Sequence, residues 1–213
     1  TVTLTYTLTD RNSVDVDFKA ETTKPTVLNL TNHSFFNISG DLSRTVLSQN
    51  LWIDSNRIAE YDKGKNVTGE LLNVRNTPFD FTKPHQIGKR IDSDDAQLAV
   101  TGGYDHSFLL RHPGDMRNPA AILYDAQSGR TLTVYTTEPA IHVYTGNGLK
   151  GNQTGKNGIT YPRRSAICLE TMHLADSPNK PQFPSTLLRP GEKFHSKTVF
   201  LFTTDPPVIM KTL

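Results

Sequence analysis

The chain has 213 residues, 35% of them hydrophobic and 21% charged, with a formal net charge of +2. This composition is typical of a globular protein, and the length suffices for one large domain with its own core. Charges of both signs are interspersed along the sequence, so it contains no basic cluster typical of nucleic-acid binding. No apolar run is long enough to span a membrane. The single cysteine excludes a disulfide within the chain.

The first 20 residues alternate between apolar and polar side chains, a two-residue period that is typical of half-buried β-strands. Residues 1–9 and 14–20 are each expected to form a strand, and the cluster Asp10-Arg-Asn-Ser13 between them is rich in turn-forming residues. The segment therefore predicts an antiparallel hairpin. One face of this hairpin is apolar: Val2, Leu4, Tyr6, Leu8, Val14, Val16, Phe18 and Ala20.

Residues 26–31 are expected to form a third strand, which runs into the segment Asn32-His-Ser-Phe-Phe-Asn37. His33 lies there among polar and aromatic side chains. A histidine on a strand is more often structural than catalytic, but an imidazole beside aromatic rings could also donate a proton at a sugar site. Residues 46–53 predict the next strand.

The segment Gly102-Gly-Tyr-Asp-His-Ser-Phe108 combines two glycines with several polar side chains. Glycine adopts backbone angles that other residues avoid, so the chain can turn sharply just before Asp105. Asp105 could form an Asx turn, or it could hydrogen-bond a ligand. We assign His106 a structural role and expect residues 109–110 to continue a strand.

Two further expected strands, residues 120–124 and 130–136, flank a five-residue hairpin connection. Residues 140–147 follow as another strand, which contains His142. Two late strands and an end of regular structure are expected after it: residues 187–188, residues 197–202 and Pro206-Pro207. Because no stretch carries a sustained stripe of period 3.6, these short alternating runs predict an all-β antiparallel sandwich.

A short apolar run at residues 166–169 ends in Glu170. A carboxylate at the end of a buried strand is partly desolvated, which raises its pKa toward that of a useful general base. The commoner role for such a residue is a salt bridge or a backbone contact at the rim. Cys168, on the same run, is interpreted as a small buried hydrophobe and not as a reactive thiol.

Taken together, these segments resemble the aldose 1-epimerase (galactose mutarotase) family. The matching motifs are Leu30-Thr-Asn-His-Ser-Phe-Phe-Asn37, Gly102-Gly-Tyr-Asp-His-Ser-Phe108, Cys168-Leu-Glu-Thr171, Asp176-Ser-Pro-Asn179, Phe183-Pro-Ser185 and Leu188-Arg-Pro-Gly-Glu192. The resemblance implies the mutarotase β-supersandwich. It also implies an isomerase that interconverts the α and β anomers of free hexoses, such as galactose and glucose, and needs neither a metal nor an organic cofactor.

The resemblance also implies roles for four residues. Glu170 matches the family's catalytic base, and His33 matches its catalytic acid. Asp105 matches an aspartate that hydrogen-bonds a sugar hydroxyl. His142 stands where the family has a sugar-contacting glutamine, and an imidazole cannot copy the two-point contact of an amide. One family tyrosine is Phe35 here, which removes a hydroxyl group.

Two family motifs upstream of this region, Leu-His-Gly-Gly and Gly-Arg-x-x-Asn-Arg, do not occur in the sequence. Residues 1–213 are therefore expected to form a single mutarotase-like domain that lacks the N-terminal strands and matches the C-terminal two-thirds of the family. A second chain could carry the N-terminal part, or truncation or processing could have removed it. Alone, this chain is expected to show weak or no catalysis and an exposed apolar face where strands should pair.

Three points stay open from the sequence. The compartment could be the cytoplasm or, if a signal peptide was removed, the periplasm or the exterior. The expected ligand is a hexose, and neither nucleic acid nor a membrane is an expected partner. The alternative functions are a non-catalytic carbohydrate-binding β-sandwich and a hexose-6-phosphate 1-epimerase, which would need arginines around the phosphate.

Overall fold

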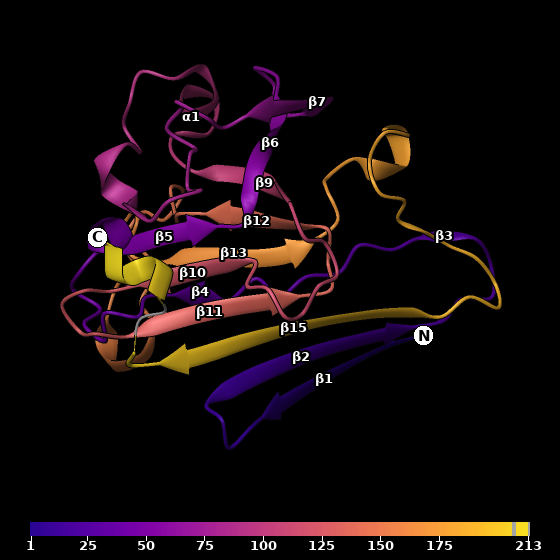
Figure 1. The fold of residues 1–213 in the computed structure, drawn as a ribbon, viewed down its shortest axis with the longest axis horizontal. Helices are drawn as coiled ribbons and strands as arrows, with labels where there is room; N and C mark the ends of the chain where they lie inside the picture. Colours follow the sequence, from indigo (N-terminus) through magenta and orange to yellow (C-terminus); the bar gives the residue numbers. More distant parts are fainter. Residues whose placement is uncertain (206–207, 213) are drawn as a thin grey trace.

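The computed structural model describes residues 1–205 and 208–212, and its regular structure is almost entirely β-strand (Figure 1). The described strands form a seven-stranded sheet, a six-stranded sheet and a two-stranded ribbon. All of their pairings are antiparallel, which confirms the predicted all-β antiparallel fold. The expectation for Pro206-Pro207 concerns residues outside the described ranges.

The order of strands brings distant parts of the chain together. The seven-stranded sheet runs β1 (Val2–Leu8), β2 (Ser13–Ala20), β15 (Phe194–Thr203), β11 (Thr131–Thr136), β10 (Ala121–Tyr124), β5 (Asn50–Ile53) and β8 (His85–Gln86). The six-stranded sheet runs β4 (Phe35–Phe36), β13 (Ile167–Met172), β12 (Ala140–Tyr144), β9 (Asp105–Leu110), β6 (Ser55–Tyr61) and β7 (Val67–Asn73). The ribbon pairs β14 (Leu187–Leu188) with β3 (Thr26–Val27).

Helical structure is confined to short segments. They are α1 (Ala96–Thr101) and the 3₁₀ segments η1 (Val46–Ser48), η2 (Ile87–Lys89), η3 (Lys156–Gly158), η4 (Ser177–Asn179) and η5 (Val208–Thr212). The sequence did not predict α1, because six residues are too few for a periodic stripe. Its ends carry recognisable caps, since the Asp95 side chain accepts from two backbone N–H groups and Gly102 is left-handed. Among the described residues, no helix is both long and apolar enough to cross a membrane.

The main hydrophobic core lies between the two large sheets and draws side chains from both. The alternation of side chains along each strand then decides which residues face away from this core. On β13, for example, Ile167 and Leu169 belong to the core, so Cys168 and Glu170 lie on the opposite face of the six-stranded sheet. The outer face of this sheet is where the candidate site forms.

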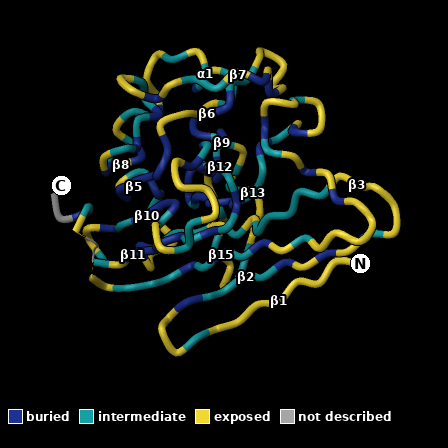
Figure 2. The backbone as a smooth tube through the Cα atoms, turned by 45° about the vertical axis from the view of Figure 1, so that its right-hand side comes forward, coloured by how far each residue is buried: buried dark blue, intermediate teal, exposed yellow. Residues whose placement is uncertain are grey.

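Strand β1 forms the predicted hairpin with β2, but its apolar face is not buried. Leu4 is 43% exposed and Leu8 is 81% exposed, and Figure 2 shows β1 as an exposed edge of the molecule. The prediction of a half-buried strand is therefore wrong for β1. Asn32 Nδ2 donates to the Tyr6 hydroxyl, but the apolar side chains of β1 remain exposed.

We expect Leu8→Lys to change the free energy of unfolding by no more than about 0.5 kcal/mol, because the side chain already lies in water. Urea denaturation measures this change. The matched control is Phe18→Ala on the buried face of β2, which should cost about 3–5 kcal/mol. A loss of similar size from Leu8→Lys would mean that something covers β1 in solution.

Three strand predictions were too long. The strand expected over residues 26–31 is only the two-residue β3, the strand expected over residues 46–53 begins with η1, and the strand expected over residues 140–147 ends at Tyr144. Each of these runs extends beyond the residues that pair with a neighbouring strand. After β3, the Leu28 N–H still donates a backbone hydrogen bond to the Thr186 carbonyl, and the chain then leaves the ribbon.

Candidate functional site

Three neighbouring strands of the six-stranded sheet bring the polar residues of the site together. The register pairs His142 on β12 with Glu170 on β13 and with Ser107 on β9. Residues directly opposite each other in adjacent strands share a face of the sheet. Asp105 lies two residues before Ser107 on β9, so it lies on this face too.

A cavity of about 470 Å³ opens on this face, a size within the range of small-molecule sites. Its lining contains all four residues predicted from the sequence, His33, Asp105, His142 and Glu170. The other lining residues are Tyr61, Ser107, Tyr144, Met172 and Ala175. None of these nine residues is a lysine or an arginine, so the only charged side chains that line the cavity, apart from histidine, are carboxylates.

Glu170 is almost completely buried at the inner end of this cavity, with its side chain 7% exposed. Burial raises the pKa of Glu170, and the negative charge of Asp105 acts in the same direction. The nearby imidazoles of His142 and His33 oppose this shift without cancelling it. A carboxylate with a raised pKa binds a proton more readily, so Glu170 is well suited to act as a base.

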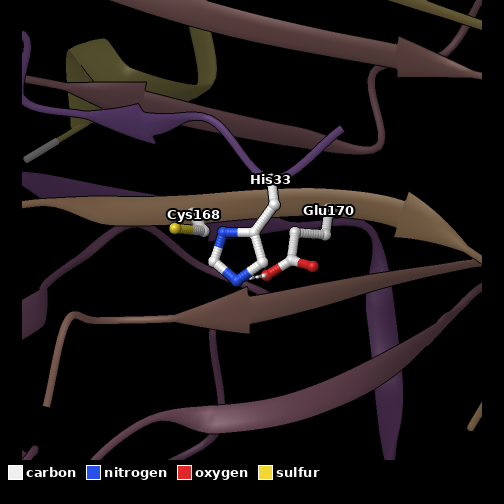
Figure 3. Close-up of side chains that lie close together, drawn as sticks. All are labelled: His33, Cys168 and Glu170. Carbon is white, nitrogen blue, oxygen red and sulfur yellow. Dashed lines mark ion pairs between the residues drawn. The ribbon is translucent and has the colours of Figure 1, made fainter. Parts of the chain in front are cut away.

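His33 contacts Glu170 directly, with its Nε2 atom 3.3 Å from Oε1 (Figure 3). The histidine precedes β4, and β4 pairs with β13 through Phe35 opposite Cys168. This pairing holds the imidazole beside Glu170, although the two residues are far apart in the sequence. The ring also packs against Phe35, with centroids 5.1 Å apart, and against Tyr144, at 6.2 Å.

His142 is held between two partners on β9. Its Nε2 atom lies 2.8 Å from Asp105 Oδ1, and its Nδ1 atom lies 2.9 Å from Ser107 Oγ. A carboxylate only accepts hydrogen bonds, so Nε2 must carry the proton. Nδ1 shares a hydrogen bond with the Ser107 hydroxyl. Both ring nitrogens are engaged, so His142 orients Asp105, whose Oδ2 atom has no hydrogen-bond partner among the described residues.

Sequence reasoning missed Ser107, Tyr144 and Tyr61. The first two could have been found, because each lies two residues along a strand from a predicted site residue. Tyr61 could not, because it comes from β6 and only the fold brings it to the cavity. Burial raises the pKa of Tyr61 to about 12, aided by the charge of Asp105, so its phenol keeps its proton at neutral pH.

His106 lies on the opposite face of β9 from Asp105 and is fully buried. Its Nδ1 atom accepts a hydrogen bond from the Asp105 backbone N–H at 3.3 Å, and its ring packs edge-on against Phe79 and Tyr61. Its Nε2 atom has no hydrogen-bond partner among the described residues. Burial lowers the pKa of His106 to about 3, so the ring is neutral. It does not line the cavity, in keeping with the structural role expected for it.

The arrangement can move protons between neighbouring atoms of one bound molecule. Glu170 can remove a proton from a hydroxyl group, and His33 can donate one to an oxygen close by. The 3.3 Å between the two groups means that both reach atoms joined to a single carbon. One trio of side chains, His33, Cys168 and Glu170, could in addition hold a metal ion.

Comparison with known proteins gives consistent matches over most of the chain. Residues 1–201 match the sequence profile of the family described as Aldose 1-epimerase. The chain is similar to human galactose mutarotase, at 40% identity over 202 residues, and to Escherichia coli K12 aldose 1-epimerase, at 37% over 205 residues. The matched regions cover 95% of this chain, but only 57% of the human protein and 58% of the bacterial one.

Two solved structures show the same fold. One is a GalM/aldose epimerase homologue from C. elegans, with a TM-score of 0.83 and 27% identity, covering 95% of this chain and 59% of that one. The other is a galactose 1-epimerase from Lactobacillus acidophilus NCFM, with a TM-score of 0.80 and 29% identity, covering 95% and 56%. The predicted mutarotase-like sandwich is therefore confirmed, and the chain spans less than two thirds of the relatives it matches.

Proposed function

The chain belongs to the aldose 1-epimerase family, and from this we propose that it interconverts the α and β anomers of free hexoses such as galactose and glucose. One observation carries the proposal. A buried carboxylate with a raised pKa and a half-exposed imidazole, Glu170 and His33, lie 3.3 Å apart in a cavity of suitable size.

In the proposed reaction, Glu170 takes the proton from the anomeric hydroxyl while His33 gives a proton to the ring oxygen. The bond between the anomeric carbon and the ring oxygen breaks, and the open-chain aldehyde forms. Both oxygens are bonded to the anomeric carbon, so an acid and a base that touch each other can serve them at once. After the aldehyde rotates, the same two groups reverse their roles and the ring closes on the other face. Only protons move, so this scheme calls on no cofactor.

We assign sugar binding to Asp105 and His142. The free oxygen of Asp105 accepts a hydrogen bond from a sugar hydroxyl, while His142 holds the carboxylate in place and Ser107 holds the His142 ring. Tyr61 keeps its phenolic proton and lies on the same wall. A neutral hexose suits this lining better than a hexose phosphate, because two carboxylates would repel a phosphate and no lysine or arginine of the described residues lines the cavity.

The chain covers 57% of the human relative, so we propose that it acts weakly by itself and fully with a second polypeptide that carries the remaining part. The exposed apolar face of β1 is consistent with such a partner. The test follows optical rotation of freshly dissolved α-D-galactose and α-D-glucose, with this chain alone and with that polypeptide added. Faster mutarotation of either sugar supports the proposal. Sugar binding without acceleration in both preparations would identify a non-catalytic binding module instead.

We expect Asp105→Asn to weaken galactose binding by about 10- to 100-fold, the usual effect of losing a hydrogen bond to a charged group. The amide keeps the contact with His142 but replaces the free carboxylate oxygen with a donor. NMR titration with galactose measures the dissociation constant. The control is Asp115→Asn, because Asp115 does not line the cavity and pairs with Arg117. Equal affinity of the Asp105 variant and the original chain would remove Asp105 from the sugar site.

A further inference from the structure

Three different donor atoms lie close together beside the cavity: His33 and Glu170 line it, and Cys168 is buried next to them on β13. His33 offers a nitrogen, Cys168 a sulfur and Glu170 an oxygen, and these atoms all lie within 4.8 Å of one another (Figure 3). Nitrogen, sulfur and oxygen ligands together suit zinc and similar borderline ions, whereas magnesium and calcium prefer oxygen alone. We propose that these three side chains form a binding site for a zinc-type divalent cation.

The distances fit such an ion with little movement. In tetrahedral zinc sites, bonds of about 2.0–2.1 Å to nitrogen and oxygen place those two ligand atoms about 3.3 Å apart. The His33 Nε2 and Glu170 Oε1 atoms are already 3.3 Å apart. The longer zinc–sulfur bond requires the sulfur to lie about 3.5 Å from them. The three donor atoms lie within 4.8 Å of one another, so closing the remaining gap requires a shift of up to about 1.3 Å.

The fold holds these donors in place without an ion. Cys168 and Glu170 lie two residues apart on β13, which is flanked by β12 and β4, so their separation is fixed by the strand. His33 is held from the other side by the pairing of Phe35 with Cys168 and by its packing against Phe35 and Tyr144. Preorganised ligands reduce the entropy that binding must overcome.

The charges of the neighbouring groups also favour a cation. Burial raises the pKa of the Cys168 thiol, as do the charges of Glu170 and Asp105, so a bound cation must displace the thiol proton. The resulting thiolate and the Glu170 carboxylate neutralise a divalent ion, and Asp105 adds a further negative charge nearby. Three protein ligands leave a fourth tetrahedral position, and two of the ligands, His33 and Glu170, line the cavity. This is the coordination of zinc sites that keep an exchangeable position for water or another small ligand.

The proposed ion would occupy the same atoms that we assign to proton transfer. This consequence rests on the proposed function, while the binding itself does not. A bound ion would take the lone pairs of Glu170 and His33, so it would inhibit anomer exchange and compete with the sugar. The site is therefore an inhibitory one and supplies no cofactor.

Cobalt(II) tests the binding without any turnover. We expect one equivalent of cobalt(II), added to the chain in a phosphine reductant, to produce a thiolate-to-cobalt charge-transfer absorption that zinc then abolishes. The chain has one cysteine, so this absorption reports on Cys168 alone. We expect Cys168→Ser to lose the absorption and to bind zinc at least tenfold more weakly, as measured by competition with a chromophoric chelator.

Two further variants complete the test. His33→Asn changes a half-exposed side chain and should also weaken zinc binding at least tenfold, which keeps the proposal testable if Cys168→Ser fails to fold. His195→Asn, at a histidine of similar exposure that pairs with Asp17, should bind zinc like the original chain. Absence of the thiolate absorption, or unchanged zinc affinity in the Cys168 or His33 variant, would overturn the site.

Activity separates this inference from the proposed function. In a preparation that accelerates mutarotation, zinc should inhibit the original chain and leave the Cys168→Ser variant largely uninhibited. A thiolate absorption without any mutarotation would uphold the metal site and count against the enzyme. Mutarotation without the thiolate absorption would support the proposed enzyme and count against the metal site.

Discussion

Replacing Glu170 with glutamine is expected to slow catalysed mutarotation by about 10²–10⁴-fold, the usual contribution of one positioned acid–base group. Glutamine has the same shape, but its amide cannot take up the proton of the anomeric hydroxyl. Burial makes the effect large, because water has little access to the carboxylate and cannot replace it. The measurement is the rate of optical rotation change in whichever preparation catalyses the reaction, this chain alone or with the complementary polypeptide.

The same carboxyl sets the expected pH dependence. The base must be deprotonated, so the rate is lost as the pH falls through the pKa of Glu170. Because burial raises this pKa, the loss should begin at a higher pH than an ordinary glutamate would give. The acid side of the pH profile of the original chain measures this pKa.

Two controls accompany the Glu170 variant. Glu60→Gln, at a glutamate outside the cavity, should leave the rate unchanged. His33→Asn should slow the reaction by a comparable factor, since it removes the proton donor. An unaltered rate in both Glu170→Gln and His33→Asn would exclude these two residues from the mechanism.

The second large effect concerns stability in acid. His106 is fully buried, and its pKa is lowered from 6.5 to about 3. A group whose pKa is depressed by folding stabilises the protein above its unfolded pKa, and this contribution is lost as the pH falls toward the folded pKa. Between about pH 7.5 and about pH 4.5, the loss from His106 alone is about 2–3 kcal/mol. Urea denaturation at the two pH values measures it.

A variant of His106 isolates this contribution. We expect His106→Leu to reduce the difference in unfolding free energy between the two pH values by about 2–3 kcal/mol, because leucine does not titrate. The matched control is Ile141→Val, a small truncation in the neighbouring strand β12. It should cost about 0.5–1.5 kcal/mol at both pH values and leave the difference unchanged. The same pH dependence in His106→Leu and the original chain would show that His106 is not the buried group responsible.

Some elements of the fold can be predicted from the sequence and others cannot, for identifiable reasons. The hairpin of β1 and β2 and the hairpin of β10 and β11 were predicted correctly, because alternation and turn residues are local signals. The exposure of β1 was not predicted, because alternation shows that a strand has an apolar face but does not show whether another segment covers that face. The shortness of β3 has a similar cause, since a strand ends where its partner ends.

The site shows the same division. Motifs placed His33, Asp105, His142 and Glu170 among the candidates, and all four line one cavity. The sequence could not show that His142 already has both nitrogens engaged, since Ser107 and Asp105 belong to another strand. Nor could it show that Cys168, interpreted as a buried hydrophobe, lies beside the proposed acid and base.

By itself, the sequence determined the strand-rich fold and the identity of the polar residues, because side-chain period and short motifs are properties of neighbours along the chain. The tertiary structure alone decided that His33 and Glu170 touch, that Asp105 keeps one oxygen free, and that one face of β1 stays in water. These outcomes depend on which strands become neighbours and in which register. That choice is made by the packing of the whole core between the sheets, which no local stretch of residues encodes.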